Sequence, residues 1–124
     1  MLRKYVVIGS LNLLVAVALG AFGAHGLKSI LTVSQLNTYE TGVHYHMIHA
    51  LGILLIAVLS AHLKPSRQLL WSGRMLFAGI ICFSGSLYVL SVTGITWLGI
   101  ITPIGGVAFI IGWLLLAVAA LRNS

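Results

Sequence analysis

The chain has 124 residues, of which 60% are apolar and only 6% are charged. Soluble domains carry about a quarter of their residues as charged groups, so this composition excludes an ordinary water-soluble fold and indicates a membrane protein. The formal net charge is +6, but the basic residues stand singly or in pairs at the ends of apolar runs. That pattern favours membrane orientation over binding of nucleic acid, which we do not expect as a partner.

The first apolar run covers residues 5–24 and follows Arg3 and Lys4. About 20 helical residues, at a rise of 1.5 Å each, cross the hydrocarbon core of a bilayer. The apolar core of a signal peptide is shorter, about 7–15 residues. We therefore expect this run to remain in the protein as a spanning helix.

Residues 27–39 mix polar and apolar side chains and are too polar to span a bilayer. Two alternatives stay open for this segment. It is either a short helix that lies at the membrane interface, or a loop followed by the first turns of the next helix, with Ser34 as the N-cap.

Three further spans follow in chain order, at about residues 42–61, 73–92 and 103–121. A basic loop that contains Pro65 separates the second span from the third, because proline disfavours helix at the residue before it. An uncharged connection leads to the fourth span, where Thr102 and Pro103 are expected to be the N-cap and the first helical residue. The sequence has no convincing internal repeat.

The basic residues divide unequally between the two ends of these spans. Lys28 lies alone at one end, and the other end holds Arg3, Lys4, Lys64, Arg67, Arg74 and Arg122. Cytoplasmic loops carry the excess of Lys and Arg in membrane proteins. We therefore predict an all-α bundle of four transmembrane helices in a single domain (residues 1–124), in the plasma or inner membrane, with both termini in the cytoplasm.

Small residues gather on several of the spans and predict close packing of helices. Without side chains, helix backbones approach closely and gain dispersion contacts that lipid does not offer. A kink, a lipid groove or a pore-lining face are the functional alternatives. The expected packing residues are Gly20, Gly23, Ala24, Gly85, Gly105 and Gly106.

A polar cluster lies at the outer ends of the first two spans, at the end opposite the basic loops. Its candidate site residues are His25, Glu40, His44, Tyr45 and His49, and the segment also holds His46. At about 100° per residue, Glu40 and His44 share one face of a helix, whereas His46 and His49 share another. A metal site built from this helix alone therefore needs a partner such as His25.

Three interpretations of the cluster compete. In the first, Glu40 pairs with His44 or Lys28, and the histidines and tyrosines form a hydrogen-bond network that joins the first two helices, since unpaired ionisable groups are costly in a membrane. In the second, neutral imidazoles bind a metal or haem. In the third, Glu40 and the histidines titrate along a path for protons or a small solute.

Catalysis is not expected from this sequence. General acid–base and nucleophilic mechanisms need paired groups, and Glu40 is the only carboxylate side chain of the chain. No motif marks a Ser–His pair. Cys82 is the only cysteine, so the chain forms no internal disulfide and no cysteine-based metal site.

Four blocks of sequence resemble one family of small bacterial membrane proteins. The blocks are Gly20-Ala-Phe-Gly-Ala-His-Gly-Leu27, Tyr39-Glu-Thr-Gly-Val-His-Tyr45 with His49-Ala-Leu51, Phe83-Ser-Gly-Ser-Leu-Tyr88, and Ile101-Thr-Pro-Ile-Gly-Gly106 with Gly112-Trp113. In this order and over nearly the whole chain, they are similar to domain-of-unknown-function family 423, the YgdD/YwdK-like proteins.

The resemblance implies a four-span protein of the cell membrane and brings no activity, substrate or cofactor with it. The family pattern often has Gln at the position of His46, which argues against a metal role for that residue. His25, Glu40, Tyr45 and His49 match the pattern, so a shared site is expected to involve them.

The sequence thus predicts a non-enzymatic structural or accessory membrane protein that binds lipid or a partner protein and has no cofactor. Its expected partners are membrane lipids and a second copy of the chain or another membrane protein. The first alternative is an oligomeric transporter or channel that uses the Glu40 and histidine cluster. The second is a metal- or haem-binding membrane protein.

Overall fold

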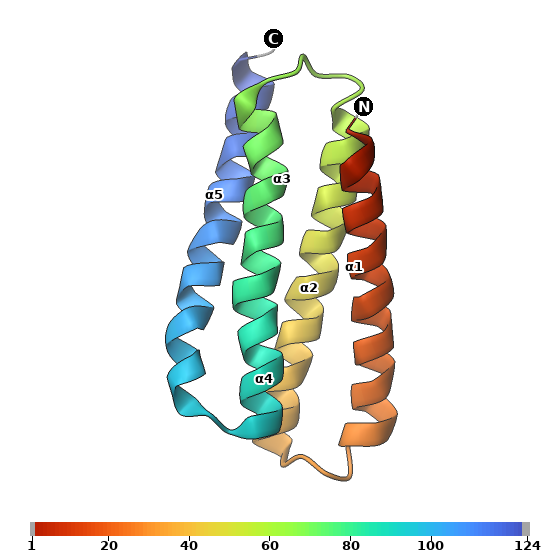
Figure 1. The fold of residues 1–124 in the computed structure, drawn as a ribbon, viewed down its shortest axis with the longest axis vertical. Helices are drawn as coiled ribbons and strands as arrows, with labels where there is room; N and C mark the ends of the chain where they lie inside the picture. Colours follow the sequence, from red (N-terminus) through yellow and green to blue (C-terminus); the bar gives the residue numbers. More distant parts are fainter. Residues whose placement is uncertain (1, 123–124) are drawn as a thin grey trace.

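The computed structural model describes residues 2–122 as an up-and-down bundle of four long helical rods (Figure 1). Each rod is long and apolar enough to cross a membrane, which confirms the predicted fold class. The elements in chain order are α1 (Arg3–Phe22), η1 (Gly23–Leu27), α2 (Val33–Leu59), α3 (Arg67–Gly79), η2 (Ile80–Ser84), α4 (Gly85–Thr93), η3 (Thr96–Ile100) and α5 (Ile101–Arg122).

The second rod begins earlier than its apolar run suggests. Thr32 is its N-cap, and it forms a capping box in which the Thr32 side chain accepts from the Gln35 backbone N–H while the Gln35 side chain accepts from the Thr32 N–H. The prediction of Ser34 as N-cap is therefore wrong. Residues 33–39 form the first turns of α2, which is the second of the two alternatives for segment 27–39.

The fourth rod also begins before the position that the sequence indicates. The short 3₁₀-helix η3 runs directly into Ile101, so Thr102 lies inside α5 and does not cap it. The Thr102 hydroxyl instead lies 2.6 Å from that of Ser86 and joins α5 to α4. Pro103 is tolerated there because the first turn of a helix requires few backbone N–H donors.

Among the single elements, α3 with α5 and α1 with α2 are the two pairs that make the most extensive contacts. The rod formed by α3, η2 and α4 also packs along α2 and so joins the two pairs (Figure 1). The best-buried apolar side chains lie where these rods meet, among them Ile53, Ile56, Leu69, Leu76 and Phe109. The core therefore centres on α2, α3 and α5, and α1 covers one side of it.

η2 is a π-helical turn in the middle of the third rod. A π turn carries one residue more than an α turn and often replaces proline as the cause of an irregularity in a helix. Within η2, the buried Ser84 hydroxyl donates to the Gly42 carbonyl of α2 at 2.8 Å. The turn thus anchors the third rod to the second.

The expected packing residues differ in how closely the neighbouring helices approach them. A Cβ on Gly23 would lie 2.4 Å from the Tyr39 ring, and a Cβ on Gly105 would lie 2.3 Å from the Phe83 backbone nitrogen, so both glycines permit close helix contacts. Gly20 lies beside Val43, and Ala24 is exposed. Gly85 and Gly106 have only distant neighbours, at 4.0 and 3.9 Å.

Candidate functional site

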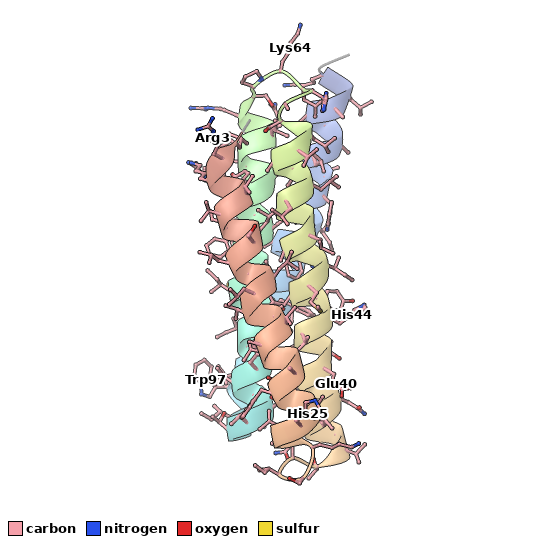
Figure 2. All side chains as sticks on the ribbon, turned by 90° about the vertical axis from the view of Figure 1, so that its right-hand side faces the viewer. Arg3, His25, Glu40, His44, Lys64 and Trp97 are labelled. Carbon is pink, nitrogen blue, oxygen red and sulfur yellow. The ribbon has the colours of Figure 1, made fainter. Side chains whose placement is uncertain are left out.

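The five candidate residues do not converge on one point. His25 lies in η1, and Glu40, His44 and Tyr45 lie on α2, all with exposed side chains. His49, one turn beyond Tyr45, is buried. Figure 2 shows His25 and Glu40 near the end of the bundle that lies opposite Arg3 and Lys64.

Glu40 and His44 share a groove between the first two rods. The groove has a volume of about 240 Å³. We call it the outer groove, and it is lined by Gly20, Gly23, Ala24, Tyr39, Glu40, Val43, His44 and Met47. The 100° rotation per residue places Glu40 and His44 one above the other, as the spacing predicts.

Small residues on the first rod and a tyrosine on the second create this groove. Gly20, Gly23 and Ala24 present little or no side chain. The Tyr39 ring packs on the bare backbone of Gly23, and its hydroxyl donates to the Leu19 carbonyl at 2.6 Å. A partly buried hydrogen bond between the two rods therefore fixes the Tyr39 side of the groove.

The Glu40 carboxylate has no partner within residues 2–122. It forms no hydrogen bond or ion pair there, so the expected pairing with His44 or Lys28 is wrong. Its exposure explains this result, because a carboxylate near the end of a span reaches water and headgroups. The Glu40 carboxylate in the groove is therefore available to a cation or a hydrogen-bond donor that does not belong to residues 2–122.

His46 is the polar centre of the bundle, although the candidate list omits it. Its Nε2 lies 3.0 Å from Asn12 Oδ1, and its Nδ1 lies 2.9 Å from the Tyr88 hydroxyl. The Asn12 amide nitrogen donates to the Ile8 carbonyl at 2.8 Å, so the Asn12 oxygen is an acceptor. Nε2–H therefore donates to Asn12, and Nδ1 accepts from Tyr88.

This network joins three of the four rods and satisfies both nitrogens of a neutral imidazole. Unsatisfied polar groups are costly in lipid. Because both His46 nitrogens already have partners, the network favours a role in helix packing over ligand binding. The sequence offers one signal for it: Asn12 is the only strongly polar side chain within the apolar run 5–24. Tyr88 lies 42 positions from His46, and no spacing rule connects them.

His49 also has a structural environment. Its Nδ1 lies 2.7 Å from the Tyr45 carbonyl, to which it donates. Its ring stacks on Phe109 of α5, with ring centroids 3.5 Å apart and planes at 11°. Trp113 adds a tilted contact at 5.7 Å. His49 thus holds α2 against α5, away from the outer groove.

Within residues 2–122, no group of three His, Cys, Asp or Glu side chains is arranged to hold a metal ion. Cys82 is half-buried and forms no disulfide within these residues.

Glu40 and His44 face outward, so a path for protons or a small solute along them requires several copies of the chain. The transport interpretation stays a prediction.

Comparison with known proteins places the chain among small bacterial membrane proteins. The family described as "Protein of unknown function (DUF423)" matches residues 19–106. The UPF0382 membrane protein YwdK of Bacillus subtilis (strain 168) is 50% identical over 98% of each chain. A UPF0382 membrane protein of Staphylococcus epidermidis is 46% identical over 98% of each chain, and one of Staphylococcus saprophyticus is 45% identical over 98% of this chain and 99% of the relative.

No solved structure is significantly similar to this one. The family match covers more than half of the chain, and the relatives align along nearly all of it. They carry the word membrane in their names, in agreement with the four apolar rods. The chain therefore belongs to the DUF423 family of membrane proteins of unknown function.

Proposed function

We propose that this protein is a non-enzymatic accessory protein of the bacterial cell membrane that binds a membrane lipid or a partner protein in the outer groove. The supporting observation is the groove itself, which lies on the outside of the bundle between two spanning rods and contains the unpaired Glu40 carboxylate. We further propose that both termini face the cytoplasm.

A phospholipid with a primary amine suits the groove better than other occupants. α2 has 27 residues and is about 40 Å long, and Glu40 lies about 10 Å from its start, near the edge of the hydrocarbon core. Lipid amines lie near this depth, and a primary ammonium donates hydrogen bonds to a carboxylate. Met47 and Val43 lie further along the groove and would contact the acyl chains.

The test compares two leucine substitutions on the same helical rod. Ala24→Leu fills the outer groove, whereas Ala21→Leu adds the same side chain at an exposed position outside it. Lipid retention is measured by native mass spectrometry of detergent-purified protein, with phosphatidylethanolamine and phosphatidylcholine as probes. We expect retention of phosphatidylethanolamine to fall about tenfold in Ala24→Leu and to be unchanged in Ala21→Leu.

Glu40→Gln tests the role of the carboxylate. We expect it to remove the preference for phosphatidylethanolamine, because the primary ammonium of this lipid donates N–H hydrogen bonds to the Glu40 carboxylate and the trimethylammonium of phosphatidylcholine cannot. Equal retention of both lipids by all four proteins would exclude the lipid. A cross-linked partner protein lost only in Ala24→Leu, with lipid retention unchanged, would assign the groove to a protein helix instead.

The proposed orientation has its own test. Lys28 directly follows η1 and is the only Lys or Arg at the end of the bundle that holds Glu40. Arg3 and Lys64 lie at the other end (Figure 2). In a Cys82→Ala background, we expect a membrane-impermeant maleimide to label Ser29→Cys in intact cells. Ser66→Cys should react only after permeabilisation. The reverse labelling pattern would refute cytoplasmic termini.

A further inference from the structure

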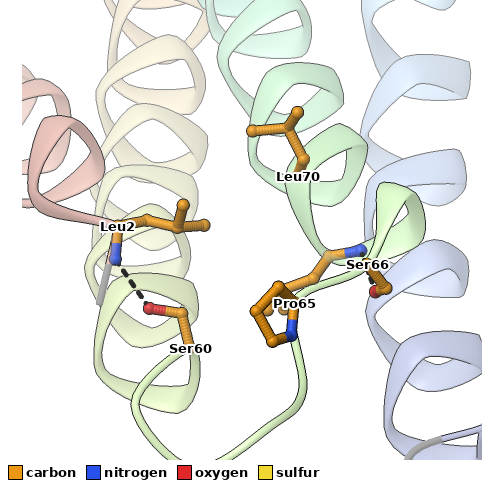
Figure 3. A pocket seen from close by; sticks show the side chains of 6 residues that line it. Leu2, Ser60, Pro65, Ser66 and Leu70 are labelled. Atoms are coloured by element: carbon orange, nitrogen blue, oxygen red, sulfur yellow. Dashed lines mark hydrogen bonds between the residues drawn. The ribbon is translucent and has the colours of Figure 1, made fainter.

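A second cavity lies at the opposite end of the bundle from the outer groove. It has a volume of about 230 Å³ and lies where the start of α1, the end of α2 and the start of α3 meet (Figure 3). We call it the basic-end pocket. Its lining residues are Leu2, Ser60, Pro65, Ser66, Leu69 and Leu70.

The pocket combines an apolar floor with one unused hydroxyl donor. Ser60 is fully engaged, since its oxygen accepts from the Leu2 N–H at 2.8 Å and its hydroxyl donates to the Ala57 carbonyl at 2.6 Å. Ser66 only accepts, from the Leu69 N–H at 3.1 Å. Its hydroxyl hydrogen therefore has no acceptor within residues 2–122.

Cationic residues adjoin the pocket in the sequence, and no acidic side chain balances them. Arg3 follows Leu2, and Lys64 and Arg67 flank Pro65 and Ser66. Glu40 is the only acidic side chain of the chain, and it lies toward the other end of the bundle (Figure 2). Positive charge therefore gathers at this end of the bundle, and no acidic side chain neutralises it there, so this end attracts an anion from outside the protein.

We propose that the basic-end pocket binds an anionic phospholipid. The phosphate accepts from the Ser66 hydroxyl and is attracted by Arg3 and Lys64, and the upper part of an acyl chain packs on Leu2, Leu69 and Leu70. Basic pockets between membrane helices bind anionic headgroups in this manner. The site is separate from the outer groove, so each site can be refuted without affecting the other.

The sharpest test adds a negative charge to one lining residue while it keeps the helix cap. Ser66 is the N-cap of α3, and aspartate is an equally good N-cap, so Ser66→Asp preserves the helix and repels a phosphate. Gln68→Glu is the matched control, because it adds the same charge to the same turn but lies in the groove between α3 and α5, outside the pocket.

Binding is measured by native mass spectrometry and by the thermal shift of purified protein, with phosphatidylglycerol and phosphatidylcholine as probes. We expect the wild-type protein to bind phosphatidylglycerol about tenfold more tightly than phosphatidylcholine. Ser66→Asp should remove this preference, and Gln68→Glu should retain most of it. If Ser66→Asp does not fold, Lys64→Gln replaces it, with Lys28→Gln at the other end as its control.

Three results would overturn the proposal. One is equal affinity of the wild-type protein for both lipids. Another is equal weakening by Ser66→Asp and Gln68→Glu, which would mean that the basic end attracts anions without a defined site. Competition with inorganic phosphate separates the two sources of a phosphate group: displacement of the lipid at low millimolar phosphate would refute a lipid ligand.

Discussion

Replacing Gly105 with alanine is expected to disrupt the bundle more than any other single methyl group. The added Cβ would lie 2.3 Å from the backbone nitrogen of Phe83 and 2.8 Å from its Cα. Backbone atoms cannot rotate away, so α5 must separate from η2. The Gly105 carbonyl also packs against Gly79, and this second contact is lost with the first. We expect the free energy of unfolding to fall by about 3 kcal/mol, which is at the upper end of the range for an overpacked core.

The neighbouring glycine supplies the control. A Cβ on Gly106 would meet only Phe83 Cδ2, at the ordinary distance of 3.9 Å. Gly106→Ala is therefore expected to be neutral or stabilising by up to about 1 kcal/mol, because alanine favours helix over glycine. Unfolding in mixed micelles of increasing dodecyl sulfate content, followed by tryptophan fluorescence, measures both variants. Equal stability of the two would show that α5 and η2 are not in close contact.

Replacing His46 with leucine is expected to be nearly as damaging, for a polar reason. Leucine approximates the size of the imidazole but leaves Asn12 Oδ1 and the Tyr88 hydroxyl without partners in the bundle interior. Leaving a buried polar group unsatisfied costs about 1–3 kcal/mol, although hydrogen bonds between membrane helices average only about 0.6 kcal/mol. We therefore expect a total loss of about 2 kcal/mol in the same unfolding assay.

Two further variants distinguish the network from simple packing. His46→Gln should recover most of the stability, because its amide donates to Asn12 and its oxygen accepts from Tyr88 at the same time. His46→Leu combined with Asn12→Leu should be less destabilising than the sum of the single variants, since it removes both ends of one hydrogen bond. Strict additivity would contradict the network.

The sequence was sufficient to predict the four spans, because long apolar runs tolerate few alternatives to spanning helices. It failed at the helix starts, where local signals compete. Thr32-x-x-Gln35 has the capping-box pattern and was visible, but polarity over residues 27–39 suggested a separate segment. At the fourth rod, the Thr-Pro pair resembled a helix start, although the preceding 3₁₀ turn already continued into the helix.

For the candidate site too, the sequence predicts some features correctly and misses others. The spacing of Glu40 and His44 was sufficient to place them on one face, and they share the outer groove. The prediction that His25 lies beside them rests only on an equal depth in the membrane. Depth does not specify the direction in which a side chain points around the helix axis, and His25 is not among the residues that line the outer groove. The His46 network depends on which rods are neighbours, and Asn12, His46 and Tyr88 come from three different rods. A single sequence does not show which rods lie next to one another in the bundle.

The π turn η2 allows one rod to serve two neighbours in succession. Before the turn, α3 packs mainly on α5; after it, α4 packs mainly on α2 and contributes little to α5. One additional residue shifts the angular phase of every later side chain by about 100°. The rod therefore turns its small and apolar residues toward a new partner, without a proline between residues 67 and 93.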